Sequence, residues 1–239
     1  MNTTPFADPE TGEIPTSLLA PLHQIRGLRQ MLVMYSCGIR EVQTKLEILN
    51  DEFQVKRHRS PIESIKSRVK EPESIARKLH RRGLEMSAES IVANLNDVAG
   101  IRVVCPFIKD IYFVANTLLA QDDITLSERK DYIAEPKANG YRSLHLVVEV
   151  PVFFSDRKQP VRVEVQIRTI AMDFWASLEH EIRYKKKDLP NSDAVAQDLR
   201  ECAEIISQTD LRMQEIHRLL GPSTLEGPPA ADGAGQAQS

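Results

Sequence analysis

A stripe of large apolar residues near the start of the chain predicts a long amphipathic helix. The spacing alternates between three and four residues, which places them on one side of an α-helix. We expect this helix to span roughly residues 21–59. The stripe consists of Ile25, Leu28, Leu32, Tyr35, Ile39, Val42, Leu46, Leu49 and Phe53.

The same spacing returns near the end of the chain and predicts a second long helix within residues 191–221. Its apolar positions form one narrow seam. Such a seam either packs against the rest of the chain or is buried between subunits. We favour self-association, because a helix that faces a core usually shows a wider apolar face. The seam consists of Val195, Leu199, Cys202, Ile206, Thr209, Met213, Ile216 and Leu220.

Between these helices, the pattern predicts an α+β domain built on a mixed β-sheet. Short apolar or alternating runs indicate strands at residues 100–105, 144–153 and 161–169. Helical spacing is found at residues 72–82, 109–120 and 171–186. We therefore assign residues 21–190 to one domain that includes the first long helix, and residues 191–221 to a C-terminal helix that serves oligomerisation.

The two ends of the chain lack this patterning. Residues 1–20 are largely polar, and residues 222–239 are rich in Gly, Ala, Pro and Gln, so we expect both tails to be disordered. No segment is an uncharged apolar run of the length that a membrane span requires, and the N-terminus lacks the regions of a signal peptide. We therefore predict a cytoplasmic protein with no membrane partner.

Composition adds limits on the class of protein. The chain has 239 residues, of which 41% are hydrophobic, enough for the core of one ordinary domain. Cys37, Cys105 and Cys202 are far apart, without the spacing of a zinc site, and we expect all three to be small buried residues. The net charge of −3 gives no reason to expect a stable nucleic-acid partner.

Positive charge is nevertheless concentrated in one region. Residues 56–82 contain ten Lys or Arg against three acids. If Pro72 lies in the first turn of a helix, Ser74 and Lys78 share one face. A charged helix is commonly just a solvated surface. Here, however, most of the charges are positive, so the side chains repel one another unless bound anions neutralise them. We interpret this helix as a phosphate binder, with Arg68 and Lys70 leading into it.

The last predicted strand has one apolar and one polar face. A period of two places Glu164 and Gln166, together with Arg162 and Arg168, on the same face. A solvated sheet would explain one such strand. The preceding strand alternates in the same way, however, and brings His145 near Glu164, which favours a functional site.

Just before these strands lies a basic loop that leads to an aromatic ring. Lys130 and Lys137 flank Pro136, and Tyr141 directly follows Gly140. Surface turns often contain such residues. The loop also fits a clamp in which lysines bind phosphates and tyrosine stacks on a base.

Asp97 stands immediately before the strand at residues 100–105, a position where aspartate often only shapes a turn. The functional alternative is a magnesium ligand, with Glu164 as the second ligand or as a base. Two acids suffice, because magnesium in nucleotide enzymes is usually held by one or two carboxylates and by phosphates.

Taken together, these residues resemble the synthetase domain of the RelA/SpoT family, and in particular its small stand-alone alarmone synthetases of the RelQ or RelP type. The resemblance covers roughly residues 31–187 and is specific because four motifs occur in order. They are SRVKEPESIARKL (67–79), DVAGIRVV (97–104), RKDYIAEPKANGYRSLHLVV (129–148) and VEVQIRT (163–169).

The resemblance implies a nucleotidyltransferase-like fold and a magnesium-dependent GTP pyrophosphokinase. Such an enzyme transfers the β,γ-pyrophosphate of ATP to the ribose 3′-hydroxyl of GDP or GTP, and GMP is a further candidate acceptor. The products, ppGpp and pppGpp, are the alarmones of the stringent response. The longer synthetases have one of two charge patterns in the acceptor loop. Residues 128–131 here read Glu-Arg-Lys-Asp, which is closer to the basic pattern but opens with an acid. This departure leaves the preference among GMP, GDP and GTP open. A homotetramer is implied as well.

Roles carry over from the family by position. Asp97 and Glu164 would flank Mg²⁺, and Glu164 would orient or deprotonate the 3′-hydroxyl. Tyr141 would stack on guanine. The residues implied for ATP are Arg68, Lys70, Ser74, Lys78, Arg102 and Arg129. Those implied for the acceptor phosphates or ribose are Lys130, Lys137, Asn139, His145 and Gln166.

Three other functions fit the sequence less well. The long family members carry a hydrolase with His-Asp metal motifs, but none of the six histidines here adjoins an aspartate, so we expect no hydrolase activity. Nucleotidyl transfer usually needs two closely spaced acids on one strand, and Asp97 has no such neighbour. A non-catalytic RNA-binding or regulatory oligomer would use the basic helix as its contact surface.

Overall fold

The computed structural model describes residues 27–57, 59–185 and 192–219. The tails expected at residues 1–20 and 222–239 lie outside these ranges, as do Ile25 and Leu220 of the two apolar stripes. Within the described ranges the structure has six helices and five strands.

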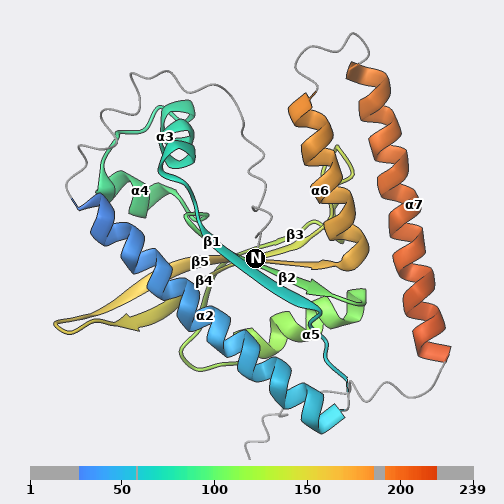
Figure 1. Cartoon of the computed structure of the whole chain (residues 1–239), viewed down its shortest axis with the longest axis horizontal. Helices are drawn as coiled ribbons and strands as arrows, with labels where there is room; N and C mark the ends of the chain where they lie inside the picture. Colours follow the sequence, from blue (N-terminus) through green and yellow to red (C-terminus); the bar gives the residue numbers. More distant parts are fainter. Residues whose placement is uncertain (1–26, 58, 186–191, 220–239) are drawn as a thin grey trace, which may run out of the picture.

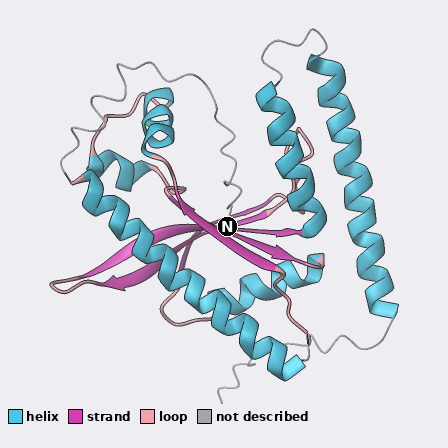
Figure 2. Ribbon diagram, in the orientation of Figure 1, coloured by secondary structure: helices cyan, strands magenta, loops and turns pink. Residues whose placement is uncertain are grey.

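The centre of the molecule is a five-stranded sheet with the order β1-β2-β5-β4-β3. Only β2 and β5 run parallel; the other neighbouring strands are antiparallel. Figure 2 shows the strands as a twisted fan with helices around it. The strands are β1 (Ser64–Val69), β2 (Ala99–Cys105), β3 (Thr125–Asp131), β4 (Leu144–Phe153) and β5 (Lys158–Thr169).

One face of the sheet is covered by helices α2 (Leu28–Arg57) and α5 (Ile108–Leu119), which form the core with it (Figure 1). The N-terminal stripe lies on this face as predicted: it is buried from Tyr35 onward, whereas Leu28 and Leu32 are half-buried. The strands contribute the apolar side of each pleat, and the side chains of Val163 and Val165 are fully buried. Burial of about 25 cal/mol per Å² of apolar surface makes this face the main source of stability.

The other helices surround the opposite, polar face of the sheet. Helices α3 (Pro72–Arg81) and α4 (Ala88–Asn94) connect β1 to β2, and Pro72 does lie in the first turn of α3. Helices α6 (Ile170–Lys185) and α7 (Ser192–Leu219) follow β5 and lie side by side (Figure 1). The expected helices and strands are thus confirmed, with ends within a few residues of the predicted ones, except that the predicted start of the first helix at residue 21 lies outside the described residues.

Three elements were not anticipated: β1, α4 and β3. Strands β1 and β3 are the two edges of the sheet, and they carry charged residues in place of a clear apolar alternation. Edge strands often have this composition because one side of their backbone faces solvent. Lys130 therefore lies on β3, and its predicted placement in a loop was wrong.

Helix α7 packs with a different face than its apolar seam suggests. Its buried residues are Ala203 and Asp210, and the Asp210 carboxylate accepts a hydrogen bond of 2.5 Å from the Thr169 hydroxyl. Much of the predicted seam is exposed, including Met213 and Ile216. The seam is therefore largely available to another surface. The expectation of three buried cysteines was also wrong, because only Cys105 is buried, Cys37 is half-buried and Cys202 is exposed.

Within the described residues, the structure contains no helix with the length and apolar character needed to cross a membrane.

The contact between α2 and β5 leads to a test of the fold. A Cβ atom added at Gly38 would lie 2.6 Å from Cγ1 of Val161, a stiff β-branched side chain. Gly38→Ala should therefore lower the free energy of unfolding by about 1–3 kcal/mol in urea titrations, because overpacking outweighs the gain in helix propensity. Glu41→Ala, on the exposed side of the same helix, should change it by less than about 0.5 kcal/mol. A Gly38→Ala protein more stable than the wild type would contradict the packing described.

Candidate functional site

The register of the sheet brings polar side chains from neighbouring strands into one row. Arg102 on β2 is the partner of Gln166 on β5, and Gln166 is also the partner of His145 on β4. His145 in turn pairs with Lys130 on β3. Glu164 lies two residues before Gln166 and so shares its face. This face is the one that α2 and α5 leave uncovered.

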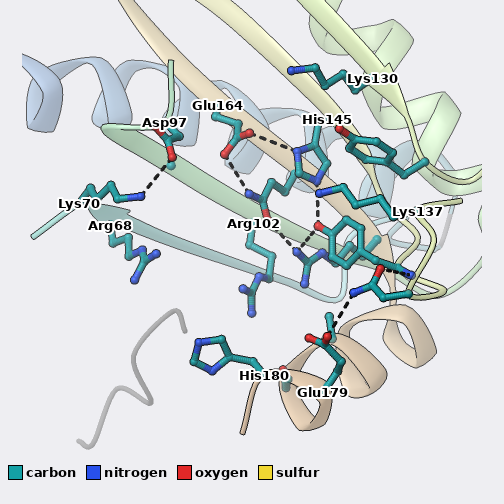
Figure 3. Close-up of a pocket in the computed structure, with 18 of the residues that line it drawn as sticks. Arg68, Lys70, Asp97, Arg102, Lys130, Lys137, His145, Glu164, Glu179 and His180 are labelled. Carbon is teal, nitrogen blue, oxygen red and sulfur yellow. Dashed lines mark hydrogen bonds and ion pairs between the residues drawn. The ribbon is translucent and has the colours of Figure 1, made fainter. Parts of the chain in front are cut away.

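The row forms the floor of a cavity of about 620 Å³. Figure 3 shows its walls, with Arg68, Lys70 and Asp97 at one end and Lys130 and Lys137 at the other. Seven Lys or Arg line the cavity, against three carboxylates. Such an excess of cations in a concave site favours a ligand with several negative charges.

Most of the predicted site residues meet in this cavity. The residues brought together are Arg68, Lys70, Lys78, Asp97, Arg102, Lys130, Lys137, Asn139, Tyr141, His145, Glu164 and Gln166. Ser74 and Arg129 are not among the lining residues. Arg129 precedes Lys130 on β3 and therefore points to the other face, where its guanidinium lies 3.6 Å from the Asp131 carboxylate.

Two lysines converge on Asp97 at the end of the cavity that Arg68 also lines. Oδ2 of Asp97 accepts hydrogen bonds from the ammonium groups of Lys78, at 2.6 Å, and Lys70, at 3.2 Å. Burial by itself raises the pKa of the Asp97 carboxyl, but the two lysines outweigh this effect and hold the pKa below its ordinary value. Asp97 is therefore ionised, and it keeps Lys70 and Lys78 in place at this end of the cavity.

The second oxygen of Asp97 fits a magnesium ion. Oδ1 is buried and accepts no hydrogen bond from the residues that the structure describes. A buried carboxylate oxygen without a donor is costly unless a cation or ligand contacts it. No cluster of three or more His, Cys, Asp or Glu is placed to hold a metal in the described ranges. A magnesium site in a nucleotide enzyme needs only one or two carboxylates, because phosphates supply other ligands.

Glu164 occupies the middle of the floor and accepts hydrogen bonds at both oxygens. Oε1 lies 3.1 Å from Nδ1 of His145, and Oε2 accepts a 2.9 Å hydrogen bond from the Gln166 amide (Figure 3). Burial raises the pKa of the Glu164 carboxyl, but these hydrogen bonds outweigh it and the net pKa is lowered. Burial lowers the pKa of His145, which favours the neutral imidazole.

Tyr141 and the loop before it form the other end of the cavity. The Lys137 ammonium lies 4.8 Å from the Tyr141 ring centroid and 4.5 Å from that of Tyr132. Gly140 has a φ of 89°, and a Cβ atom there would lie 2.5 Å from Cβ of Ala203 on α7. The turn that presents Tyr141 therefore requires glycine both for its backbone conformation and for the approach of α7.

Four functional candidates were missed by sequence reasoning: Tyr132, Arg168, Glu179 and His180 all line the cavity. Arg168 was on the predicted polar face of β5 and could have been included on that ground. Glu179, whose carboxylate accepts a 3.1 Å hydrogen bond from the Asn139 amide, comes from α6 (Figure 3). No spacing in the sequence indicates it, because its position depends on how α6 packs.

Two of the arginines that line the cavity lie close together, bridged by one carboxylate oxygen. Oδ1 of Asp173 lies 3.1 Å from Nη1 of Arg102 and 3.3 Å from Nη1 of Arg168. Burial, together with repulsion from Arg168, lowers the pKa of Arg102 to about 10. Arg102 therefore remains a cation at neutral pH, and Asp173 makes the close approach of the two guanidinium groups tolerable.

Known proteins share both the sequence and this arrangement. A family model described as a region found in RelA / SpoT proteins matches residues 67–189. The GTP pyrophosphokinase YwaC of Bacillus subtilis is 45% identical over 188 residues, which cover 78% of this chain and 89% of YwaC. The similarity thus extends over nearly the whole length of that relative.

Solved structures agree. The small alarmone synthetase 1 from Bacillus subtilis, bound to its product pppGpp, matches with a TM-score of 0.74 and 36% identity over 81% of this chain and 98% of that chain. The same synthetase bound to AMPCPP matches with a TM-score of 0.68 and 34% identity over 80% of this chain and 96% of that chain. These matches confirm the expected fold, and the chain belongs to the RelA/SpoT family.

Proposed function

We propose that this chain is a GTP pyrophosphokinase that makes alarmones. It transfers the β,γ-pyrophosphate of ATP to the 3′-hydroxyl of GDP or GTP, with GMP as a further acceptor. The single observation that carries this proposal is the position of Glu164, an ionised carboxylate between a cation-rich end and an aromatic end of one cavity. The name of YwaC and the pppGpp-bound synthetase support the same activity.

The two ends of the cavity suit two different nucleotides. Lys70, Lys78, Arg68 and Arg102 suit the triphosphate of ATP, since clustered cations neutralise adjacent phosphates. The AMPCPP-bound relative supports an adenine nucleotide in such a fold.

The opposite end suits the guanine nucleotide. Tyr141 offers a ring for stacking on the base. The polar residues around it, assigned to the acceptor phosphates or ribose, are Lys130, Lys137, Asn139, His145 and Gln166. Lys130 is held by a 2.8 Å ion pair with Glu128. The locations of Ser74 and Arg129 outside the cavity give no support to the ATP-binding roles that the family resemblance implies for them.

The reaction needs little covalent chemistry from the protein. The acceptor 3′-hydroxyl gives its proton to Glu164 while its oxygen attacks the β-phosphorus of ATP. The bond from this phosphorus to the oxygen that bridges the α-phosphate breaks, and AMP leaves. Positioning and cations dominate catalysis of such transfers, and Arg102, Lys70 and Lys78 are placed to neutralise the charge that develops.

Asp97 and Glu164 are the residues that would hold magnesium. The buried, unpaired Oδ1 of Asp97 is the observation that supports a metal there. A bound magnesium ion supplies charge neutralisation for the phosphates. The two lysines on Oδ2 of Asp97 leave Oδ1 for this purpose.

Self-association, as a homotetramer in the cytoplasm, completes the proposal. Helix α6 carries an exposed apolar row at four-residue spacing: Ile170, Phe174, Leu178 and Ile182. Helix α7 adds Ile205, Met213 and Ile216, which are also exposed. Contiguous exposed apolar surface is typical of protein interfaces.

Activity is tested most directly at Glu164. Glu164→Gln removes the proton acceptor but keeps the shape of the side chain, so turnover should fall by about 10²–10⁴-fold while the circular dichroism spectrum is unchanged. Purified protein is incubated with ATP, Mg²⁺ and GMP, GDP or GTP, and nucleotides are resolved by anion exchange. Glu149→Gln, on the adjacent strand and outside the cavity, should retain wild-type turnover.

A wild-type protein that yields neither AMP nor a more highly phosphorylated guanosine would exclude the synthetase function. Unchanged function in Glu164→Gln, together with loss of function when the charges of Lys78 and Arg82 are reversed, would instead favour the RNA-binding alternative.

The metal assignment is tested at Asp97. Asp97→Asn should weaken Mn²⁺ binding in the presence of AMPCPP by about tenfold or more, because a carboxylate ligand becomes a neutral amide. Electron paramagnetic resonance measures the free Mn²⁺ without relying on turnover. Asp123→Asn, whose side chain pairs with Lys45 outside the cavity, serves as the control. Equal Mn²⁺ affinity in Asp97→Asn and wild type would remove Asp97 from the metal site.

The proposed interface is tested on α7. Ile205→Glu and Ile216→Glu should each shift the protein to smaller assemblies in light scattering, because burying an unpaired carboxylate is costly. Phe153→Glu, at a residue that is also exposed but lies on the β4-β5 hairpin, should leave the mass unchanged. If all three variants keep the wild-type mass, the α7 surface is not an interface.

A further inference from the structure

Arg168, at the end of β5, is a buried arginine that makes hydrogen bonds through four of its five N–H groups. Its side chain lies next to the floor of the cavity and is only 5% exposed. Nε donates to the Ser143 hydroxyl at 3.4 Å, and Nη1 to the Asp173 carboxylate at 3.3 Å. Nη2 donates twice, to the Tyr141 hydroxyl at 2.5 Å and to Oε1 of Gln166 at 2.8 Å. Both hydrogens of Nη2 therefore point to residues that surround Glu164.

The guanidinium group sets the direction of the first hydrogen-bond chain. Arginine only donates hydrogen bonds, so the Tyr141 oxygen must accept from it. The single hydroxyl hydrogen of Tyr141 is then directed to Nε2 of His145, 2.8 Å away. Because Nε2 accepts, the proton of the neutral imidazole lies on Nδ1. Nδ1 faces Oε1 of Glu164 at 3.1 Å and donates to it.

A second chain runs from the same nitrogen through Gln166. Oε1 of Gln166 accepts from Arg168, which orients the amide so that its NH₂ group points the other way. That group donates to Oε2 of Glu164 at 2.9 Å. Both chains thus start at Nη2 of Arg168, and both end as donors to Glu164.

We propose that Arg168 is a positioning residue for the transfer, which sets the direction of two hydrogen-bond chains so that both oxygens of Glu164 act as acceptors. This inference rests on the proposed function of Glu164. A carboxylate has about four lone-pair sites, so Glu164 retains sites for the 3′-hydroxyl after accepting from His145 and Gln166. The two donors fix the plane of the carboxylate before the acceptor binds.

This arrangement also decides where the hydroxyl proton goes. As the 3′-oxygen forms its bond to phosphorus, the O–H bond breaks and the proton passes to Glu164. It cannot move on to His145, because Nδ1 of the imidazole already carries a hydrogen. His145 is therefore a hydrogen-bond donor to the base in this site and not a relay for the proton.

The carboxylate of Asp173 links Arg168 to the end of the cavity that is assigned to ATP. It accepts a hydrogen bond from Arg168 and forms an ion pair with Arg102, which lies in the half of the cavity assigned to ATP. The position of Arg168 is therefore determined from both sides of the floor, by Asp173 and by Ser143.

The inference can be tested without measuring activity, by nuclear magnetic resonance of the full-length protein labelled with ¹⁵N in its histidine rings. The His145 signals are assigned by their loss in His145→Gln. The wild type should show neutral His145 with the hydrogen on Nδ1, and Arg168→Met should populate the tautomer with the hydrogen on Nε2. Arg162→Met, the same change on the same face of β5 but at a residue paired with Glu149, should keep the Nδ1 form.

Tyr141→Phe provides a second route to the same result, since it removes only the oxygen that connects Arg168 to His145. Tyr141→Phe should therefore also populate the tautomer of His145 with the hydrogen on Nε2. If Arg168→Met does not fold, the result for Tyr141→Phe tests the proposal in its place. A wild type with the hydrogen on Nε2, or an unchanged tautomer in the folded Arg168→Met and Tyr141→Phe proteins, would overturn the proposal.

Kinetics then separate positioning from binding. Arg168→Met should lower kcat by about 100-fold with a smaller change in the KM for ATP, and Arg168→Lys, which still only donates, should recover part of kcat. Equal kcat in Arg168→Met and wild type would overturn the positioning role. If the wild type itself makes no alarmone, the proposed function fails, whereas the tautomer measurement still tests the hydrogen-bond chains.

Discussion

The site depends on the alternation of side chains along β5, whose two faces lie in opposite environments. Val161, Val163 and Val165 are fully buried on the side covered by α2 and α5, so the strand cannot shift by one residue without exposing them. The same register therefore fixes Glu164 and Gln166 on the opposite face. Hydrophobic burial on one side of the sheet thus holds the chemistry in place on the other.

Charge within the cavity is balanced by a small number of well-placed acids. Asp97 holds Lys70 and Lys78, while Asp173 holds Arg102 and Arg168. Each acid accepts from two cations, so positive charge remains in excess along the cavity. A protein with such an excess gains stability when a polyanion binds, because binding removes repulsion that folding alone leaves in place. The repulsion between these cations therefore favours binding of a nucleotide, whose phosphates neutralise them.

Helix α7 contributes to the site from outside the sheet. It contacts the turn before Tyr141, where Gly140 lies against Ala203, and the Arg142 guanidinium binds the Ala203 carbonyl oxygen at 3.2 Å and the Glu204 carboxylate at 2.9 Å. The opposite side of the same helix is apolar and exposed. One helix therefore supports the acceptor end of the cavity with its inner face and offers surface for self-association with its outer face.

Much of this protein is readable from its sequence, because strong periodicity marks its long helices and central strands. The α2 stripe, the two faces of β5 and most of the cavity residues, including Asp97 and Glu164, follow from spacing and from the family resemblance. Short or charged elements such as β1 and β3 were not predicted, because edge strands lack the apolar alternation that marks a buried strand.

Only the tertiary structure decided which groups meet. That Arg129 faces away from the cavity, that Glu179 reaches Asn139, and that Arg168 governs the hydrogen bonds of Glu164 depends on strand register and on helix packing. These distances join residues far apart in the chain. The sequence determined the local pattern of each element, and the contacts between elements came from burying their apolar faces together, which no local pattern specifies.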